Sequence, residues 1–419
     1  MMEQREQAIT VGVNLNDRPD FAYSMEELRN LAGACDVDII GELTQNVHQI
    51  SSSHYMGTGK LEELKALREQ TGASTVICND ELSPSQIRNL EAALQCKVID
   101  RTLLILDIFA ERAKTKEAQL QVEVAQLQYM LPRLIGLRES LGRQGGGVGT
   151  KNRGAGEKKL ELDRRRIEEK ITALHKELES LVAQRQVQRK QRKKNNVPVV
   201  GLVGYTNAGK SSIMNVLLEA YGGPAAKQVL AEDMLFATLE TSVRQIELPD
   251  NKSFLLTDTV GFVRQLPHHL IKAFRSTLEE VAESDLLVHV VDYSNPEYEQ
   301  MIAVTEETLK ELGAGHIPVI YAYNKVDRIE GALPEQEADR VYVSAKRQTG
   351  IDTLMERIRG HIFKDYVRCE MLIPFEQGKL VAYFNEHAHI FSTSYEENGT
   401  KLDLECKRAD YEKYKEQLI

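Results

Sequence analysis

The stretch Val197–Ser212, VPVVGLVGYTNAGKSS, decides the fold of the central part of the chain. Its first seven residues are an apolar run that predicts a buried strand, and the apolar segment Ser211–Ala220 predicts a helix after it. Between them, Gly204–Ser211 matches the pattern GxxxxGK[ST], in which backbone N–H groups and a helix N-terminus surround phosphate groups. We therefore expect Lys210 to reach the β- and γ-phosphates of a nucleotide and Ser211 to coordinate Mg²⁺.

A second motif follows the predicted strand FLLTD. Asp258-Thr-Val-Gly261 places a carboxylate at the end of that strand, 54 residues after Gly204. Such a carboxylate can hold Mg²⁺, in many cases through water, and Gly261 lets a backbone N–H approach the γ-phosphate. Alone this motif is usually a turn, but its place after the phosphate-binding loop favours a nucleotide site.

Two further motifs predict recognition of a base. Asn324-Lys-Val-Asp327 ends the apolar run IPVIYAYN, and Ser344-Ala-Lys346 follows VYVS. Asp327 can accept hydrogen bonds from N1–H and the exocyclic amine of guanine, a donor pair that adenine lacks. Asn324 and Lys325 would brace the loop and the base plane, although an Asp here could instead begin a helix.

The predicted nucleotide-binding residues all lie in these four motifs. They are Gly204, Tyr205, Thr206, Asn207, Ala208, Gly209, Lys210, Ser211, Ser212, Asp258, Thr259, Val260, Gly261, Asn324, Lys325, Asp327, Ser344, Ala345 and Lys346.

The apolar runs of this region are nearly continuous, which is typical of strands buried on both faces of a mostly parallel sheet. The four motifs occur in order, each at the C-terminal end of a predicted strand. They resemble the G domain of translation-factor-type GTPases over about 165 residues, which implies binding and hydrolysis of GTP with Mg²⁺. In Ras-like enzymes a Gln after the second motif orients the attacking water, whereas this chain has Phe262. No catalytic residue is therefore assigned, and we expect slow intrinsic hydrolysis that a partner stimulates. Asn207 resembles the asparagine with which some GTPases bind K⁺, but it could equally be an ordinary loop residue.

Charge is unevenly distributed outside this domain. The whole chain has a formal net charge of −10, yet residues 111–196 hold 21 Lys and Arg against 11 Asp and Glu. A basic segment in an acidic protein suggests a polyanionic partner. Leu120, Val124, Leu127 and Leu131 follow steps of four and three residues, and Ile167–Leu181 repeats that rhythm. The pattern predicts two helices that form an antiparallel hairpin.

The segment Gly142–Gly156 has seven glycines in fifteen residues and predicts a long tip without helix or strand. Basic residues in and beside this tip could contact RNA phosphates, although runs of charge are often only solvated helix faces. The candidate RNA-binding residues are Arg143, Lys151, Arg153, Lys158, Lys159, Arg164, Arg165 and Arg166.

The remaining segments complete an α/β fold. Residues 1–110 alternate short strands (Ser74–Cys78, Lys97–Ile99) with helices (Leu61–Gln70, Ser85–Leu94) and predict an N-terminal α/β subdomain. The hairpin takes residues 111–196, the G domain 197–364, and a small C-terminal α+β domain 365–419. The apolar runs are too short to span a membrane and the N-terminus has no apolar signal core. Five scattered cysteines argue against a zinc site or a disulfide framework and favour the cytoplasm.

Several stretches outside the four motifs resemble the HflX family of ribosome-associated GTPases. They are Asn79–Glu91, Asp100–Leu134 and Gly145–Ile167, together with YTNAGKSS, FATLE and DTVGF. The resemblance spans nearly the whole chain and implies a factor that binds the large ribosomal subunit and its rRNA. It also implies that the factor splits or rescues stalled ribosomes, with the GTP form active and hydrolysis driving release.

The resemblance also bears on the Mg²⁺ ligands. It aligns FATL with the switch I segment that closes on Mg²⁺, so the expected ligands are Ser211, Thr238 and Asp258, with Thr241 as an alternative to Thr238. Two stretches depart from the family. Arg153-Gly-Ala-Gly-Glu157 replaces the usual RGPGE, and Glu240-Thr-Ser242 replaces Asp-Pro-Thr. The shape of these two loops is left open.

Two alternative functions are compatible with parts of the sequence. A GTPase of ribosome assembly or RNA maturation would share the G domain, but its catalysis on a base would not need a long glycine-tipped arm. A coiled-coil scaffold with an inert nucleotide pocket would not need complete G motifs. We expect a monomer that binds GTP and GDP.

Overall fold

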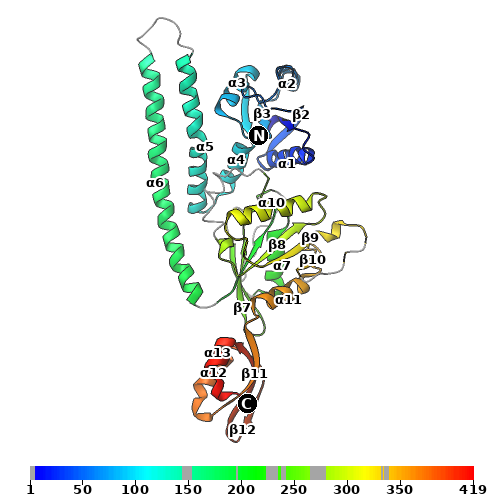
Figure 1. Ribbon diagram of the computed structural model, residues 1–419, viewed down its shortest axis with the longest axis vertical. Coiled ribbons are helices and arrows are strands. Elements are labelled where there is room, and N and C mark those ends of the chain that lie inside the picture. Colours follow the sequence, from blue (N-terminus) through cyan, green and yellow to red (C-terminus); the bar gives the residue numbers. More distant parts are fainter. Residues whose placement is uncertain are drawn as a thin grey trace. The chain divides into compact units, whose positions relative to one another are not determined.

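The computed structural model describes residues 5–143, 153–194, 197–222, 235–236, 242–264, 280–331, 334 and 339–419, and for residues 134–143, 153–160 and 184–194 the backbone alone (Figure 1). They form two compact units. The first unit comprises residues 1–188, 233–240 and 263–276, and the second comprises residues 189–232, 241–262 and 277–419.

The first unit is built on a four-stranded parallel sheet in the order β2-β1-β3-β4. Its strands are β1 (Glu6–Leu15), β2 (Val37–Val47), β3 (Thr75–Cys78) and β4 (Lys97–Asp100). Its helices are α1 (Phe21–Ala34), α2 (Thr58–Thr71), α3 (Pro84–Leu94) and α4 (Arg101–Arg112).

Capping residues in the sequence mark where two of these helices begin. Ser83 caps α3, Gln86 completes a capping box with it, and Pro84 occupies the first turn, where no N–H partner is needed. Asp100 caps α4 by accepting from the backbone N–H of Leu103, 2.9 Å away. The expected strands and helices of this region are therefore present, within three residues at their ends.

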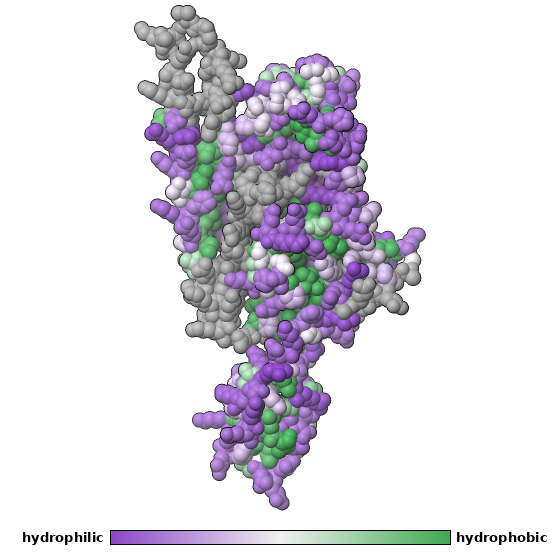
Figure 2. Space-filling view, viewed as in Figure 1, coloured by the Kyte–Doolittle hydropathy of each residue, from purple (hydrophilic) through white to green (hydrophobic). Residues whose placement is uncertain are grey.

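The hairpin consists of α5 (Lys116–Arg143) and α6 (Arg153–Lys194), as the leucine spacing predicted. A narrow seam joins the two helices, and green residues mark it along the hairpin in Figure 2. The seam residues are Leu120, Val124, Leu127, Leu174, Leu178 and Leu181.

One expectation about the tip was wrong. Gly142–Gly156 was expected to contain no helix, yet α5 continues through Gly142 and α6 begins at Arg153, so Gly154 and Gly156 are helical. Each glycine costs a helix only about 1 kcal/mol, and extending an existing helix avoids the cost of nucleation. Residues 144–152 lie outside the described residues.

The second unit holds a six-stranded sheet in the order β10-β9-β8-β5-β7-β6, in which only β6 is antiparallel to its neighbour. The strands are β5 (Val199–Val203), β6 (Ser242–Glu247), β7 (Ser253–Asp258), β8 (Leu286–Asp292), β9 (Val319–Asn324) and β10 (Arg340–Tyr342). The helices are α7 (Lys210–Tyr221), α10 (Tyr298–Glu311) and α11 (Ile351–Ile362), with a short 3₁₀ turn at Val326–Arg328. The mostly parallel sheet is thus confirmed, and its buried strands explain the continuous apolar runs.

The same unit ends in a small antiparallel sheet in the order β11-β13-β12. Its strands are β11 (Tyr366–Ile373), β12 (His389–Glu396) and β13 (Gly399–Lys407), and its helices are α12 (Gly378–His387) and α13 (Arg408–Lys413). Met371, Phe384, Leu402 and Leu404 are buried between this sheet and its helices. The α+β character expected of the C-terminal segment is present.

No helix in the described part of the chain is long and apolar enough to cross a membrane. The four-domain division drawn from the sequence stays a prediction.

Candidate nucleotide site and RNA-facing arm

The loop between β5 and α7 has the backbone shape that its motif predicted. Gly204, Asn207 and Gly209 have φ angles of 141°, 60° and 95°, which L-residues other than Asn rarely adopt. A Cβ at Gly204 would lie 2.2 Å from the carbonyl oxygen of Val290, so the glycine is also needed for a close approach to β8. The loop passes directly into α7, whose first N–H groups are available for phosphate.

Lys210 lies folded against this loop. Its Nζ donates to the carbonyl oxygens of Gly204 and Tyr205, at 3.2 and 3.0 Å, and its side chain is buried. Burial lowers the pKa of Lys210 to about 8, and the negative charge of Asp258 opposes that shift. A phosphate oxygen offers a charged acceptor in place of two neutral carbonyls, so nucleotide binding would favour the charged form of this side chain.

Two candidate Mg²⁺ ligands lie together at the start of α7. The hydroxyl of Ser211 donates to Oδ2 of Asp258 at 2.6 Å, and Asp258 is fully buried at the end of β7. A hydroxyl and a carboxylate in this arrangement are the hard oxygen donors that Mg²⁺ prefers. The two side chains predicted from separate motifs are therefore brought together. Thr238 and Thr241 lie outside the described residues.

The segment after Asp258 lies against the phosphate-binding loop. Gly261 packs so closely that a Cβ there would be 2.5 Å from Cα of Thr206. The backbone N–H of Thr206 donates to Phe262 at 2.7 Å, and that of Phe262 donates to Gly204 at 3.2 Å. Only 2% of Phe262 is exposed. This side chain offers no polar group to a water molecule, so no group of this residue can replace the glutamine of Ras-like enzymes.

The base-recognition motifs are joined by hydrogen bonds. The amide of Asn324 donates to the carbonyl of Ala208 at 2.9 Å and accepts from the backbone N–H of Ala345 at 3.1 Å. The hydroxyl of Ser344 donates to Asp327 at 2.6 Å and lowers the pKa of that carboxyl. Asp327 is thereby kept as an ionised acceptor, as recognition of guanine requires.

Two residues near the site were not found from the sequence. Asp292, at the end of β8, accepts from Nζ of Lys325 at 2.8 Å and so orients the lysine expected to brace the base. His289 is buried beside Gly204, and burial lowers its pKa to about 3, with Lys210 as a second cause. Asp292 could have been suspected because it ends an apolar strand at the same sheet edge as Asn324. His289 has no such signal within LLVHVVD.

Phe236 and Arg264, which come before and after the second motif in the sequence, belong to the first unit. Phe236 is buried against Phe109 of α4, with ring centroids 4.7 Å apart. Arg264 forms an ion pair with Asp20 at 3.1 Å and lies 4.7 Å from the ring of Tyr23. Arg264 comes two residues after Phe262, so the N-terminal unit holds a segment directly continuous with the nucleotide site.

A buried carboxylate of the N-terminal sheet contacts the helical arm. Asp100 is fully buried and accepts from the hydroxyl of Tyr129 at 2.7 Å, from Arg133 at 3.1 Å and from the backbone N–H of Leu82 at 2.9 Å. Burial and the nearby Asp100 raise the pKa of Tyr129, which keeps its hydroxyl a donor. The guanidinium of Arg133 stacks on that ring, 3.1 Å from its centroid. This cluster joins α5 to the sheet.

The candidate RNA-binding arginines of α6 form only surface ion pairs. Arg164 and Arg165 each lie 3.5 Å from Glu161, and Arg166 lies 3.7 Å from Asp163. Pairs of this kind contribute about 1 kcal/mol or less, so they do not prevent exchange for a phosphate. For four further candidates the structure describes only the backbone, which is helical: Arg143 ends α5, and Arg153, Lys158 and Lys159 are in α6. Lys151 lies outside the described residues.

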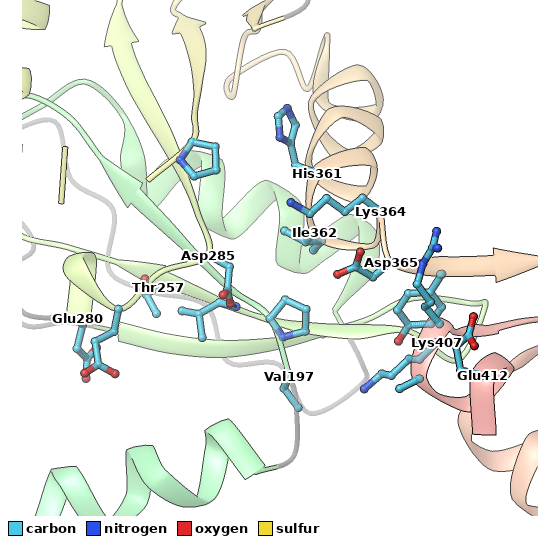
Figure 3. A pocket seen from close by; sticks show the side chains of 17 residues that line it. Val197, Thr257, Glu280, Asp285, His361, Ile362, Lys364, Asp365, Lys407 and Glu412 are labelled. Carbon is cyan, nitrogen blue, oxygen red and sulfur yellow. Dashed lines mark hydrogen bonds between the residues drawn. The ribbon is translucent and has the colours of Figure 1, made fainter. Parts of the chain in front are cut away.

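A cavity of about 840 Å³ lies elsewhere in the second unit (Figure 3). It is lined by Val197 and Asp285 at the starts of strands β5 and β8, and by Lys364 after α11. The phosphate-binding loop follows the other end of β5, so this cavity is not the nucleotide site. Among the described residues, no group of three or more His, Cys, Asp or Glu side chains could hold a metal ion.

Comparison with known proteins identifies the family. Three family profiles match successive parts of the chain: "GTP-binding GTPase N-terminal" over residues 22–110, "GTP-binding GTPase Middle Region" over 112–192, and "50S ribosome-binding GTPase" over 199–325. The chain is 46% identical over 409 residues to the GTPase HflX of Caldanaerobacter subterraneus subsp. tengcongensis, covering 97% of this chain and 93% of that protein. It is 37% identical over 401 residues to the GTPase HflX of Escherichia coli, covering 94% and 92%.

Among solved structures, a GTP-binding protein from Sulfolobus solfataricus in complex with GDP matches with a TM-score of 0.44 and 25% identity, covering 85% of this chain and 99% of that one. The two near-full-length relatives are decisive, because each exceeds 30% identity over almost the whole of both chains. The chain therefore belongs to the HflX family of GTPases, and it hydrolyses GTP with a G domain of the ribosome-binding kind.

Proposed function

We propose that this GTPase binds the large ribosomal subunit in its GTP-bound form, splits or rescues stalled ribosomes, and leaves after hydrolysis. In this proposal the protein works in the cytoplasm as a monomer. GTP orders the two switch segments, and their ordered form is the one that binds the subunit.

The observation that carries this proposal is the basic arm and its attachment. Residues 111–196 hold ten more positive than negative charges, and their helices extend over 28 and 42 residues. A straight helix rises about 1.5 Å per residue, so the longer one spans about 60 Å. Asp100 joins α5 to the sheet, so the arm has a fixed base. Such an arm can insert its basic tip deep into a folded RNA, which a flexible tether could not do.

The nucleotide site would take Mg²⁺ through Ser211 and Asp258, whose oxygens already lie 2.6 Å apart, with Thr238 as the proposed third ligand. When bound, Mg²⁺ neutralises charge that develops on the β- and γ-phosphates. Lys210 would contact the same phosphates, and Asp327 would select guanine.

The proposed catalytic deficit follows from Phe262. Its buried ring cannot orient water, so intrinsic hydrolysis should be slow until a ribosomal group or a cation completes the site. Asn207, which has a φ angle of 60°, is the proposed ligand of a K⁺ ion. GTP turnover measured in KCl and in NaCl at the same concentration tests that role. Equal rates in the two salts would reject K⁺ binding by Asn207.

The main experiment measures GTP turnover alone, then with purified large subunits, and then with small subunits or bulk tRNA. We expect stimulation of tenfold or more by large subunits only. Splitting is tested separately by light scattering of 70S ribosomes mixed with the protein and GTP. Stimulation by large subunits without loss of 70S particles would reject splitting, and equal stimulation by tRNA would reject the proposed partner.

A further inference from the structure

The small C-terminal sheet has one open edge. β12 pairs with β13 on one side, and its other side has no backbone partner among the described residues. The opposite edge strand, β11, is partly covered by the end of the chain itself. Met371 forms a bridge with Leu418, and the backbone N–H of Ile419 donates to Glu370 at 3.2 Å. Among the described residues, no segment pairs with the outer side of β12, so the whole of this edge is open to another strand.

This edge lacks the charged residues and prolines that usually prevent strand addition. Exposed edge strands are normally short, charged or interrupted by proline. In the N-terminal sheet, β2 carries Asp38 and Glu42, which pair with Arg5 and Arg29 at 3.4 and 2.9 Å. By contrast, β12 has no charge or proline from His389 to Tyr395. Its one irregularity lies between Ile390 and Ser392, which leaves the rest of the strand regular.

Two exposed aromatic residues flank the open edge. Phe391 is 46% exposed and Tyr395 is 79% exposed. The ring of Phe391 lies 4.2 Å from the guanidinium of Arg368, whose side chain hydrogen-bonds Asp403 on the side of the sheet away from the buried core. Tyr395 is paired with Thr400, whose side chain shares the face of the buried Leu402. A strand added here would therefore meet one aromatic side chain on each face of the sheet.

The charge around the edge favours a basic partner. Residues 366–419 hold seven Lys and Arg against ten Asp and Glu. Glu386, Glu396 and Glu397 are exposed next to the two ends of β12. This local charge is opposite to that of the helical arm, so the two regions are suited to different partners.

We propose that β12 is a docking site for an extended, positively charged segment of a ribosomal protein, which adds to the sheet as a fourth strand. Backbone hydrogen bonds to β12 supply the affinity, and contacts with Phe391, Tyr395 and the neighbouring glutamates supply the selectivity. The inference rests on the proposed binding to the large subunit and adds a protein contact to the RNA contact of the arm.

The test uses the full chain with p-benzoylphenylalanine at position 395, bound to purified large subunits with a non-hydrolysable GTP analogue. We expect a photocrosslink to a Lys- and Arg-rich stretch of a ribosomal protein, mapped by mass spectrometry. A synthetic peptide of the crosslinked stretch should bind the free protein. Its affinity should fall tenfold or more when alternate backbone nitrogens are methylated, because methylation removes the donors of a β-ladder.

A paired set of variants tests the edge itself. S392K/T393K places two lysines on the open strand and should reduce the crosslink at least tenfold. Q377K/A382K adds the same charge at exposed positions of the same domain, away from the edge, and should leave the crosslink unchanged. Circular dichroism of both variants should match that of the wild-type protein.

The outcomes separate this proposal from the one on which it rests. A crosslink to RNA alone, to a second copy of the chain, or to nothing, with the wild-type protein bound to the subunit, would overturn the docking site and leave the proposed function standing. Failure of the wild-type protein to bind large subunits would overturn both. Unchanged crosslinking by S392K/T393K, or equal binding of the methylated peptide, would also reject strand addition.

Discussion

At the scale of single residues, the nucleotide site depends on side chains that already contact one another. Ser211 hydrogen-bonds Asp258, Asn324 joins the phosphate-binding loop to Ala345, and Ser344 keeps Asp327 ionised. Because these contacts already restrict the side chains, less conformational entropy is lost when the nucleotide binds. Lys210 differs from the others, because its contacts with two carbonyl oxygens must be exchanged for contacts with phosphate.

The protonation of Lys210 predicts how nucleotide affinity depends on pH. Its pKa of about 8 in the free protein is lowered by burial, so the side chain is neutral in most molecules above that pH. Bound phosphate favours the ammonium, so binding above pH 8 must take up a proton. We expect the Kd of GDP to rise by up to about tenfold per pH unit above pH 8 and to be nearly constant below it.

Calorimetry in buffers of different ionisation enthalpy measures this proton directly. The control is Lys210→Arg, whose guanidinium remains charged throughout this range. That variant should bind more weakly but show no proton uptake. A wild-type protein that takes up no proton at pH 9 would contradict the assignment.

At the scale of elements, the arm is stabilised by a buried polar cluster rather than by its helix seam alone. The seam buries few side chains, and α6 is largely exposed on its outer face. Asp100 supplies what the seam lacks, because three elements, β4, α4 and α5, meet at its two oxygens. Asp100 therefore adds buried polar contacts to the apolar packing that holds the arm.

Substitutions in this cluster should have graded effects on stability. Asp100→Ala leaves the Tyr129 hydroxyl and two backbone N–H groups without their acceptor and removes the charge paired with Arg133, so it should lower the free energy of unfolding by about 3 kcal/mol. Tyr129→Phe removes one hydrogen bond and should cost about 1 kcal/mol. Met130→Ala, at a neighbouring and 44% exposed position, is the control and should change stability by less than about 0.5 kcal/mol. Urea denaturation measures all three, and equal effects of Asp100→Ala and Met130→Ala would show that the cluster contributes nothing.

The arginines of α6 allow a test of RNA contact by the arm. R164Q/R165Q/R166Q removes three charges whose present partners are partly exposed carboxylates. If these residues contact phosphates, each one lost should reduce the slope of log K against log salt by about 0.7 to 0.9. Lys176→Gln, an exposed position farther along α6, should leave the slope unchanged. Binding to large subunits between 50 and 200 mM salt gives both slopes, and identical slopes for the triple variant and the wild-type protein would exclude these arginines.

At the scale of the whole molecule, the nucleotide site and the N-terminal unit are joined by chain continuity. Residues 233–240 and 263–276 belong to that unit, although the segments on either side of each belong to the second unit. Arg264 is held there by Asp20 and Tyr23, only two residues beyond Phe262. Any rearrangement of this segment toward a γ-phosphate must therefore work against those contacts.

Release of Arg264 should accelerate basal hydrolysis. Arg264 is buried and Asp20 is partly exposed, so their ion pair and the cation–π contact together contribute about 1 to 2 kcal/mol, and Arg264→Ala should raise GTP turnover by about fivefold to thirtyfold. Asp20→Ala should act in the same direction, and the double variant should add little because both changes break one contact. Single-turnover measurements without ribosomes decide the matter. A lower rate for Arg264→Ala would show that the contact supports the active conformation instead.

Local sequence determined the parts of the fold and the nucleotide site that depend on near neighbours. The glycine-rich loop, the strand ends that carry Asp258 and Asn324, and the two helices of the arm follow from spacing and residue type, because backbone conformation and periodic burial are local properties. Local signals also misled at Gly154 and Gly156, where extension of α6 outweighed the low helix propensity of glycine.

Only the tertiary structure decided which distant residues meet. Asp100 with Arg133, Asp292 with Lys325, and Arg264 with Asp20 are contacts between separate elements, and no periodicity in the sequence encodes them. The open edge of β12 is of the same kind, since strand order depends on which strands pair. The physical reason is that these features depend on the burial of polar groups and on backbone pairing across the fold, which exist only once the elements have packed.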